Sequence, residues 1–97
     1  MVNSVAQKVN IEKVYVAMQA VCNADGTVLP RCIEWEDGFQ YKIDRIIQME
    51  SVSVLNSVER CTRYKVVVRN KLTYIFYEEE RSGLRRWYVE RKESHHN

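Results

Sequence analysis

The stretch C-I-E-W-E-D-G-F-Q-Y-K-I-D-R-I-I, residues 32–47, decides the fold of this chain. Asp37-Gly38 is a turn signal, and apolar residues alternate with polar ones on both sides of it. Such alternation is typical of two antiparallel strands that each bury one face. We therefore predict a β-hairpin here, and the rest of the sequence indicates further hairpins built around it.

The length of this loop decides which side chains share a face. A two-residue loop would place the apolar side chains of the two strands on opposite faces. A three-residue loop over residues 36–38, with its glycine left-handed, brings four apolar side chains to one buried face through the pairs Trp35–Phe39 and Ile33–Tyr41. We therefore predict the three-residue loop.

Residues 11–22 are apolar in both strand phases, as in a strand from the middle of a sheet or a barrel wall. An Asp25-Gly26 turn follows. A two-residue loop there continues the same buried face, through the pairs Val16–Trp35, Met18–Ile33 and Cys22–Leu29. Pro30 lies within the second strand, so we expect its missing N–H at an edge, a bulge or a gap in the ladder.

The second half of the chain predicts another hairpin from β-branched and aromatic residues, over residues 61–69 and 72–77. A two-residue turn at Asn70-Lys71 gives the pairs Val67–Tyr74, Val66–Ile75 and Tyr64–Tyr77. Residues 78–83 are expected to form a charged loop. Residues 85–91 are expected to form a last strand with Trp87 and Val89 facing inward.

The segment from residue 48 to residue 60 is the least regular. Serine and asparagine are frequent in it, which favours an irregular crossing connection. The alternatives are a strand that continues through Val52 and Val54, or an amphipathic turn of helix that uses Val54, Leu55 and Val58.

These elements predict an all-β fold: a single small antiparallel barrel or strongly curled sheet of about six strands made from successive hairpins. Six short strands in one open layer would leave two exposed edges, which favours closure. The 97 residues suffice for one core. We expect a flexible N-terminal lead-in over residues 1–10, a β domain over residues 11–92 and a polar tail over residues 93–97.

Composition excludes little. The net charge of +2 is too small to indicate nucleic acid or membrane by itself. No signal peptide and no apolar run of about 20 residues is visible, so we expect a cytoplasmic protein without membrane contact. The three cysteines match neither a disulfide framework nor zinc-ligand spacing, and we interpret them as small buried or half-buried side chains: Cys22, Cys32 and Cys61.

Catalytic motifs are absent from the sequence, and the two histidines, His95 and His96, lie in the expected tail. A tail fixes neither the position nor the neighbours of a general base or metal ligand. We therefore predict a non-enzymatic protein with no catalytic residues, cofactor or metal. Asp44 and Arg45 are expected to form a structural ion pair or to anchor a loop.

Basic residues alternate along one strand phase in the second half, and aromatic residues lie in the partner strand. This pattern is typical of surfaces that hold single-stranded nucleic acid, with charges on phosphates and rings under bases. It is equally typical of solvent-facing strand positions above an aromatic core. The candidate ligand or nucleic-acid surface consists of Arg63, Lys65, Arg69, Tyr74, Arg85 and Arg86.

The motifs W-E-D-G-F-Q-Y-K-I-D-R, R-Y-K-V, Y-I-F-Y and W-Y-V-E occur in this order between Val14 and Arg91. This order resembles a group of small bacterial proteins of unknown function, in which a W-x-D-G-x-x-Y-x-(I/V)-D-R core is followed by R-Y-x-V, Y-x-(F/L)-Y and W-(F/Y)-V-E. The resemblance implies a compact β domain from a bacterial cytosol and brings no activity with it.

Function is expected to be binding or assembly. We predict a module that makes protein–protein contacts, with an unknown protein partner or as a homo-oligomer. The alternative is a module that binds single-stranded nucleic acid through the basic and aromatic residues of the second half.

Overall fold

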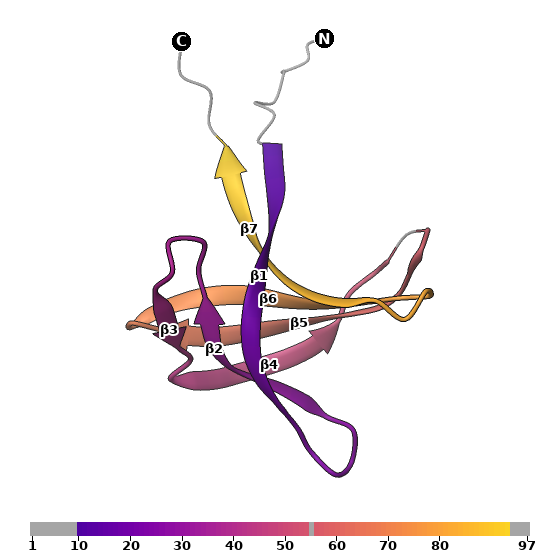
Figure 1. The fold of residues 1–97 in the computed structure, drawn as a ribbon, viewed down its shortest axis with the longest axis horizontal. Coiled ribbons are helices and arrows are strands. Elements are labelled where there is room, and N and C mark those ends of the chain that lie inside the picture. Colours follow the sequence, from indigo (N-terminus) through magenta and orange to yellow (C-terminus); the bar gives the residue numbers. More distant parts are fainter. Residues whose placement is uncertain (1–9, 55, 94–97) are drawn as a thin grey trace, which may run out of the picture.

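The computed structural model describes residues 10–54 and 56–93, and within them it is all-β. Seven strands form one antiparallel sheet in the order β3-β2-β1-β7-β6-β5-β4. The sheet is strongly curled into a half-barrel (Figure 1), as the sequence predicts. The strands are β1 (Asn10–Cys22), β2 (Val28–Glu34), β3 (Gln40–Lys42), β4 (Arg45–Ser51), β5 (Val58–Val68), β6 (Lys71–Glu80) and β7 (Arg85–Glu93).

The expected lead-in and tail fall almost entirely outside the described residues. The structure places Asn10 and Glu93 in paired strands. Among the described residues, no helix is present that could span a membrane.

Seven strands replace about six because the predicted third strand bends and divides into β3 and β4. At the bend, the Ile43 N–H donates to the Arg31 carbonyl at 2.9 Å, and the Asp44 N–H donates to the Val67 carbonyl at 2.8 Å. Arg31 lies in β2 and Val67 in β5, so two consecutive amides bond to strands near opposite edges of the sheet. The two edge strands are therefore continuous in the chain, which requires the sheet to curl.

All three glycines of the chain occupy the same place in three-residue hairpin loops, with φ values of 92°, 88° and 96°. Each glycine N–H donates at 2.9 Å to the carbonyl three residues earlier, in Asn23, Trp35 and Glu80. The side chain before each glycine accepts from the N–H after it, through Asp25, Asp37 and Ser82. The three-residue loop predicted at residues 36–38 is confirmed, and the two-residue loop predicted at Asp25-Gly26 is wrong.

The ladder between β1 and β2 follows the predicted register only in part. Met18 pairs with Ile33 as predicted, but Cys22 pairs with Val28 rather than Leu29. The shift arises from an irregularity in which Gln19 faces Cys32 and Ala20 faces Pro30. Pro30 therefore lies beside a bulge, where a residue without an N–H is tolerated. The predicted Val16–Trp35 pair lies one step beyond the end of this ladder.

The turn between β5 and β6 is at Arg69-Asn70, one residue earlier than predicted. Both residues have positive φ, 52° and 64°, which is the backbone of a type I′ hairpin turn. Val68 therefore pairs with Lys71 and Tyr64 with Ile75, so the predicted register is wrong by two residues. Because side chains repeat every two residues, this error leaves every side chain on its predicted face.

Three further expectations are corrected. Glu78 does not begin a charged loop, because β6 continues through Glu80. The irregular connection predicted over residues 48–60 is shorter, because β4 extends through Ser51 and β5 begins at Val58, and it joins neighbouring strands instead of crossing the sheet. Phe39 is 66% exposed rather than buried, because it sits at the tip of its hairpin.

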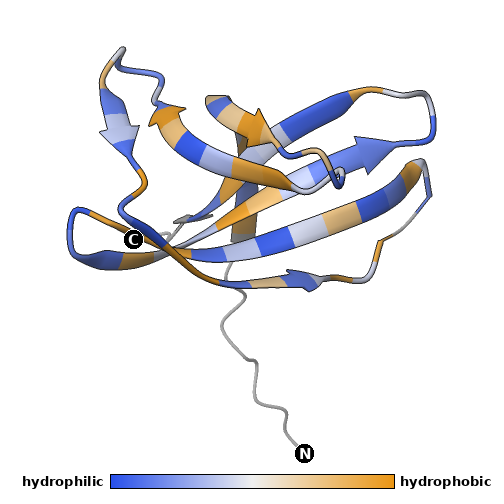
Figure 2. Ribbon diagram, turned by 90° about the horizontal axis from the view of Figure 1, so that it is seen from below, coloured by the Kyte–Doolittle hydropathy of each residue, from blue (hydrophilic) through white to orange (hydrophobic). Residues whose placement is uncertain are grey.

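The core lies on the concave face of the sheet, and apolar and polar residues alternate along the strands (Figure 2). Its members are Ile33, Ile43, Tyr64, Val66, Ile75, Tyr77 and Trp87. Each large apolar side chain buried here stabilises the fold by about 1.5–3 kcal/mol. The Tyr64 hydroxyl donates to the Val28 carbonyl, and burial raises the pKa of Tyr64 to about 12.

Candidate binding site between β6 and β7

Strands β6 and β7 are paired over only part of their length. Their ladder runs from Glu79–Arg85 to Phe76–Tyr88 and ends there. Beyond it, residues 71–75 pair only with β5, and residues 89–93 pair only with β1. Figure 1 shows β7 leaving the sheet together with β1 as a two-stranded ribbon. The sheet is therefore split between β6 and β7.

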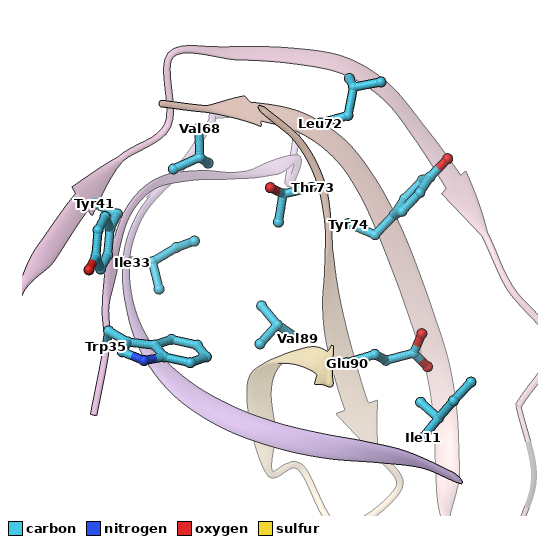
Figure 3. A pocket seen from close by; sticks show the side chains of 10 residues that line it. All are labelled: Ile11, Ile33, Trp35, Tyr41, Val68, Leu72, Thr73, Tyr74, Val89 and Glu90. Atoms are coloured by element: carbon cyan, nitrogen blue, oxygen red, sulfur yellow. The ribbon is translucent and has the colours of Figure 1, made fainter. Parts of the chain in front are cut away.

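A hollow of about 460 Å³ lies at this split (Figure 3). It is lined by Ile11, Ile33, Trp35, Tyr41, Val68, Leu72, Thr73, Tyr74, Val89 and Glu90. Consecutive residues point to opposite faces of a strand, yet both Leu72 and Thr73, and both Val89 and Glu90, line the same space. The hollow therefore reaches both faces of the sheet through the split.

The chemistry of the hollow is apolar with one charge. Its rim exposes three large side chains, Ile11 at 57%, Leu72 at 61% and Tyr74 at 45%. Glu90 is the charged residue among the ten that line it, and it forms no ion pair with another described residue. An apolar cavity of this size with few polar groups is the ordinary form of a binding site.

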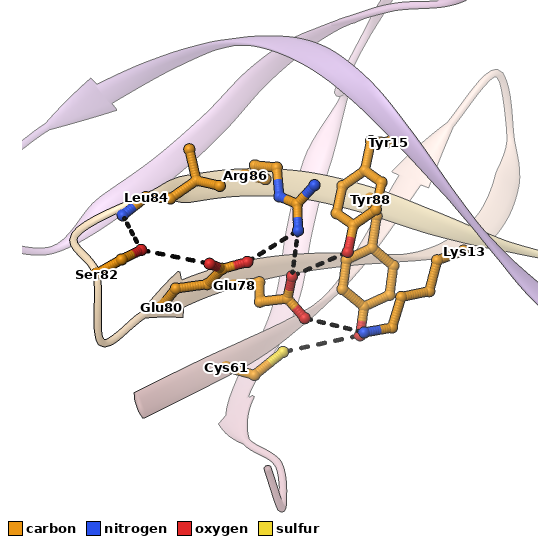
Figure 4. Close-up of polar contacts among 9 residues, drawn as sticks. All are labelled: Lys13, Tyr15, Cys61, Glu78, Glu80, Ser82, Leu84, Arg86 and Tyr88. Atoms are coloured by element: carbon orange, nitrogen blue, oxygen red, sulfur yellow. Dashed lines mark hydrogen bonds and ion pairs between the residues drawn. The ribbon is translucent and has the colours of Figure 1, made fainter. Parts of the chain in front are cut away.

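On the convex face, at the closed end of the β6–β7 pair, a carboxylate is buried in a polar cluster (Figure 4). Glu78 is 3% exposed. It accepts hydrogen bonds from Lys13 Nζ at 2.9 Å and from the Tyr15 hydroxyl at 3.0 Å. Arg86 Nη2 lies 3.7 Å from Glu78 and 2.9 Å from Glu80. The guanidinium of Arg86 also stacks on the Tyr15 ring, 3.9 Å from its centroid.

The cluster holds Glu78 ionised. Burial alone raises the pKa of this carboxyl, but the hydrogen bonds from Lys13 and Tyr15 and the charges of Lys13 and Arg86 outweigh it and lower the pKa. The hydrogen bond to Glu78 raises the pKa of Lys13. A carboxylate with these partners stabilises the fold and is not free to accept a proton from a substrate near neutral pH.

Three of the predicted surface residues lie together on the convex face. Lys65 is directly opposite Tyr74, and Arg63 is opposite Phe76. The Arg63 guanidinium lies 4.9 Å from the centroid of the Tyr74 ring and forms an ion pair with Glu50. Arg63 belongs to a row of cross-strand pairs that runs from β1 to β4 through Tyr15, Tyr88, Phe76, Arg63 and Glu50.

The other three predicted surface residues are not part of this group, although Arg86 also lies on the convex face, in the Glu78 cluster. Arg85 and Arg86 are consecutive in β7, so their side chains point to opposite faces. Each has an acidic partner: Arg85 lies 3.9 Å from Glu79, and Arg86 lies 2.9 Å from Glu80. Arg69 is in the hairpin turn, 5.6 Å from the centroid of the Tyr41 ring. The six residues therefore do not form one continuous basic surface.

Of the two roles predicted for Asp44 and Arg45, an ion pair or the anchoring of a loop, the structure shows the second for Asp44. No ion pair between described residues joins it to Arg45; its carboxylate instead accepts the N–H of Arg69 at 3.2 Å. The anchoring role is thus toward the β5–β6 turn.

The cysteines differ in burial. Cys61 is buried and Cys32 half-buried, as predicted, but Cys22 is exposed, and none of the three forms a disulfide. Burial raises the pKa of the Cys61 thiol, which lies 3.9 Å from the Tyr88 hydroxyl. The described part of the chain contains no group of three or more metal-ligating side chains. His95 and His96 lie outside the described residues.

Sequence reasoning missed the residues that form the split. Leu72, Val89 and Glu90 look like ordinary strand positions, and no local signal shows that two neighbouring strands will separate. Ile11 gave a weak signal, as an apolar residue at the start of the first strand. Comparison with known protein families, with curated proteins and with solved structures finds no match to this chain.

Proposed function

We propose that this protein is a non-enzymatic binding module that makes protein–protein contacts through the hollow between β6 and β7. The observation that supports this proposal is the apolar rim, where the side chains of Ile11, Leu72 and Tyr74 are each more than two-fifths exposed around one cavity. Monomeric proteins rarely leave large apolar side chains clustered in this way unless a partner covers them.

The nucleic-acid alternative has weaker support. Arg63, Arg85 and Arg86 each have an acidic partner within the chain, which neutralises charge that a phosphate backbone would need. The aromatic ring most accessible beside them, Tyr74, belongs to the rim of the hollow.

The test is a selection of binders from a displayed library of random linear peptides, combined with sedimentation velocity of the protein alone. Leu72→Glu places a charge on the rim and should abolish both peptide binding and any self-association. Leu84→Glu is the matched control, because Leu84 is 48% exposed in the loop at the opposite end of the β6–β7 pair. A monomer at every concentration, together with no binder that distinguishes Leu72→Glu from Leu84→Glu, would rule the proposal out.

A further inference from the structure

The main chain of β6 beside the split points its hydrogen-bonding groups into the opening. The Val67 carbonyl accepts from Asp44, so the polar groups of Val67 face β4. The main-chain N–H and C=O groups of successive residues point to alternate sides of a strand, so those of Val66 and Val68 face β6. Thr73 and Lys71 are the partners of these two residues in β6, so their N–H and C=O groups face β5. Leu72 lies between these two β6 residues and Tyr74 follows Thr73, so the N–H and C=O groups of Leu72 and Tyr74 face the split.

The opposite wall of the split offers the same groups. By the same alternation in β6, the main-chain groups of Phe76 face β7, where Phe76 pairs with Tyr88. Two residues further along β7, the main chain of Glu90 therefore also faces the split. Leu72, Tyr74 and Glu90 each present main-chain polar groups to the opening and a side chain to the hollow. No described strand pairs with them on this side.

Unpaired strand edges are templates for another strand. From this geometry we propose that the split binds an extended peptide segment of a partner protein as an additional strand beside Leu72 and Tyr74. This inference rests on the function proposed above and specifies that the partner binds as an extended segment. Because strands bound the opening on both sides, the incoming strand has no room for a sheet of its own behind it. The occupant is thus a single extended segment rather than the edge of a folded domain.

The lining sets the sequence of this segment. Side chains of the inserted strand alternate between the concave and convex faces. On the concave side they meet apolar residues, Ile33, Trp35, Val68 and Val89. On the convex side they meet Glu90, which has no ion-pair partner among the described residues, and the exposed ring of Tyr74. A lysine or arginine satisfies both, by an ion pair and a cation–π contact. The segment therefore alternates apolar and basic residues.

The experiment titrates the full chain, labelled with ¹⁵N, with three capped heptapeptides of defined sequence. The alternating peptide V-K-V-K-V-K-V should bind and shift the amide signals of Leu72, Tyr74 and Glu90. The block peptide V-V-V-V-K-K-K and the acidic peptide V-E-V-E-V-E-V should bind about tenfold more weakly or less, since they lose the alternation or the charge match. Glu90→Gln should weaken the alternating basic peptide, whereas Glu59→Gln, at an exposed acid in β5, should not.

Main-chain pairing is tested separately from the apolar contact. Leu72→Pro removes the N–H that faces the split without removing a ladder bond to β5, and should weaken binding about tenfold. Leu72→Ala keeps the N–H and tests the side chain. Methylation of alternate peptide amides tests the same bonds from the ligand side, without altering the protein.

The outcomes separate this inference from the proposed function. Equal binding of the methylated and parent peptides, or no binding of the alternating peptide up to about millimolar concentration, overturns strand insertion. Binders from the library that still depend on Leu72 would then leave the proposed function standing. Self-association of the protein alone that Leu72→Pro abolishes would also overturn the inference, because the occupant would be a second copy of this chain.

Discussion

The closed end and the split end of the β6–β7 pair are built from the same two strands and have opposite properties. At the closed end, Phe76 stacks on Tyr88 at 4.7 Å between centroids, and Tyr77 packs on Trp87 at 4.5 Å. Both faces of the closed end are therefore covered. At the split end, Leu72 is 61% exposed and faces an apolar hollow.

This difference shows that the two ends of one strand pair can have separate roles, one in stability and one in binding. The closed end contributes core packing and a satisfied carboxylate, and both stabilise the fold. At the split end, Leu72 and Tyr74 leave large side chains exposed, and the main-chain groups that face the opening are unpaired. Residues at the closed end should therefore change stability when mutated, and residues at the split end should change binding.

The largest expected effect tests this division directly. Trp87→Ala removes a buried ring that contacts both Tyr64 and Tyr77, and should lower the free energy of unfolding by about 3–5 kcal/mol. Leu72→Ala at the split should change it by less than about 0.5 kcal/mol. Urea denaturation measures both, and equal losses would remove the distinction between the two ends.

A matched pair of acids gives the next largest effect. Glu78→Gln leaves Lys13 without a carboxylate partner, whereas Arg86 keeps Glu80. Because the Lys13 side chain is partly exposed, the expected loss is about 1–3 kcal/mol. Glu90→Gln at the split should stay within about 0.5 kcal/mol. Urea midpoints compare them. A larger loss for Glu90 would mean that the split is structural.

A smaller effect is expected in the loop that closes the pair. Gly83→Ala should cost about 1 kcal/mol, because the left-handed backbone disfavours a Cβ even though no residue beyond the two chain neighbours comes within 4 Å of its position. Gly83→Asn should cost less, because asparagine tolerates this conformation. Thermal unfolding of the two variants measures the difference; an identical loss would show that strain is not the cause.

The smallest effect concerns pH. The folded-state pKa of Glu78 is lowered from its ordinary value of 4.5, so its contribution is present above about pH 4.5 and is lost as pH falls through the folded-state pKa. The free energy of unfolding should therefore fall on acidification below pH 4.5. In Glu78→Gln this decline should be shallower. Parallel declines in the two proteins would show that other carboxylates are responsible.

The approximate positions of the three glycine-containing hairpin loops could be predicted from sequence because their signals are local, although the loop length was wrong at Asp25-Gly26 and the bounds were wrong at residues 78–83. D-G and S-G each combine a glycine that permits positive φ with a side-chain acceptor for the following N–H. The Arg69-Asn70 turn escaped prediction because arginine seldom adopts positive φ, and the favoured position shifted to the next dipeptide. The faces of β5 and β6 were still predicted correctly, since a shift of two residues preserves them.

The candidate site could not be predicted because it depends on the curvature of the whole sheet. Tyr74 was named for a different reason, its place among basic residues, and it lies on the rim of the hollow. Leu72 and Glu90 are far apart in sequence, and the space between them exists only because β7 follows β1 away from β6. Glu78 was assigned to a loop because three consecutive acids resemble an exposed turn, whereas three distant side chains satisfy it.

The pairing of the first strand with the last has a consequence for synthesis. Residues 10–16 belong to the first strand, but their strand partners, residues 87–93, belong to β7 and are translated after the other six strands. Contacts between such distant positions slow folding, because the intervening chain must be ordered before they form. A nascent chain thus carries β1 half-paired until β7 has been translated. Since β7 is one wall of the split, a truncated product that lacks this strand would also lack the site.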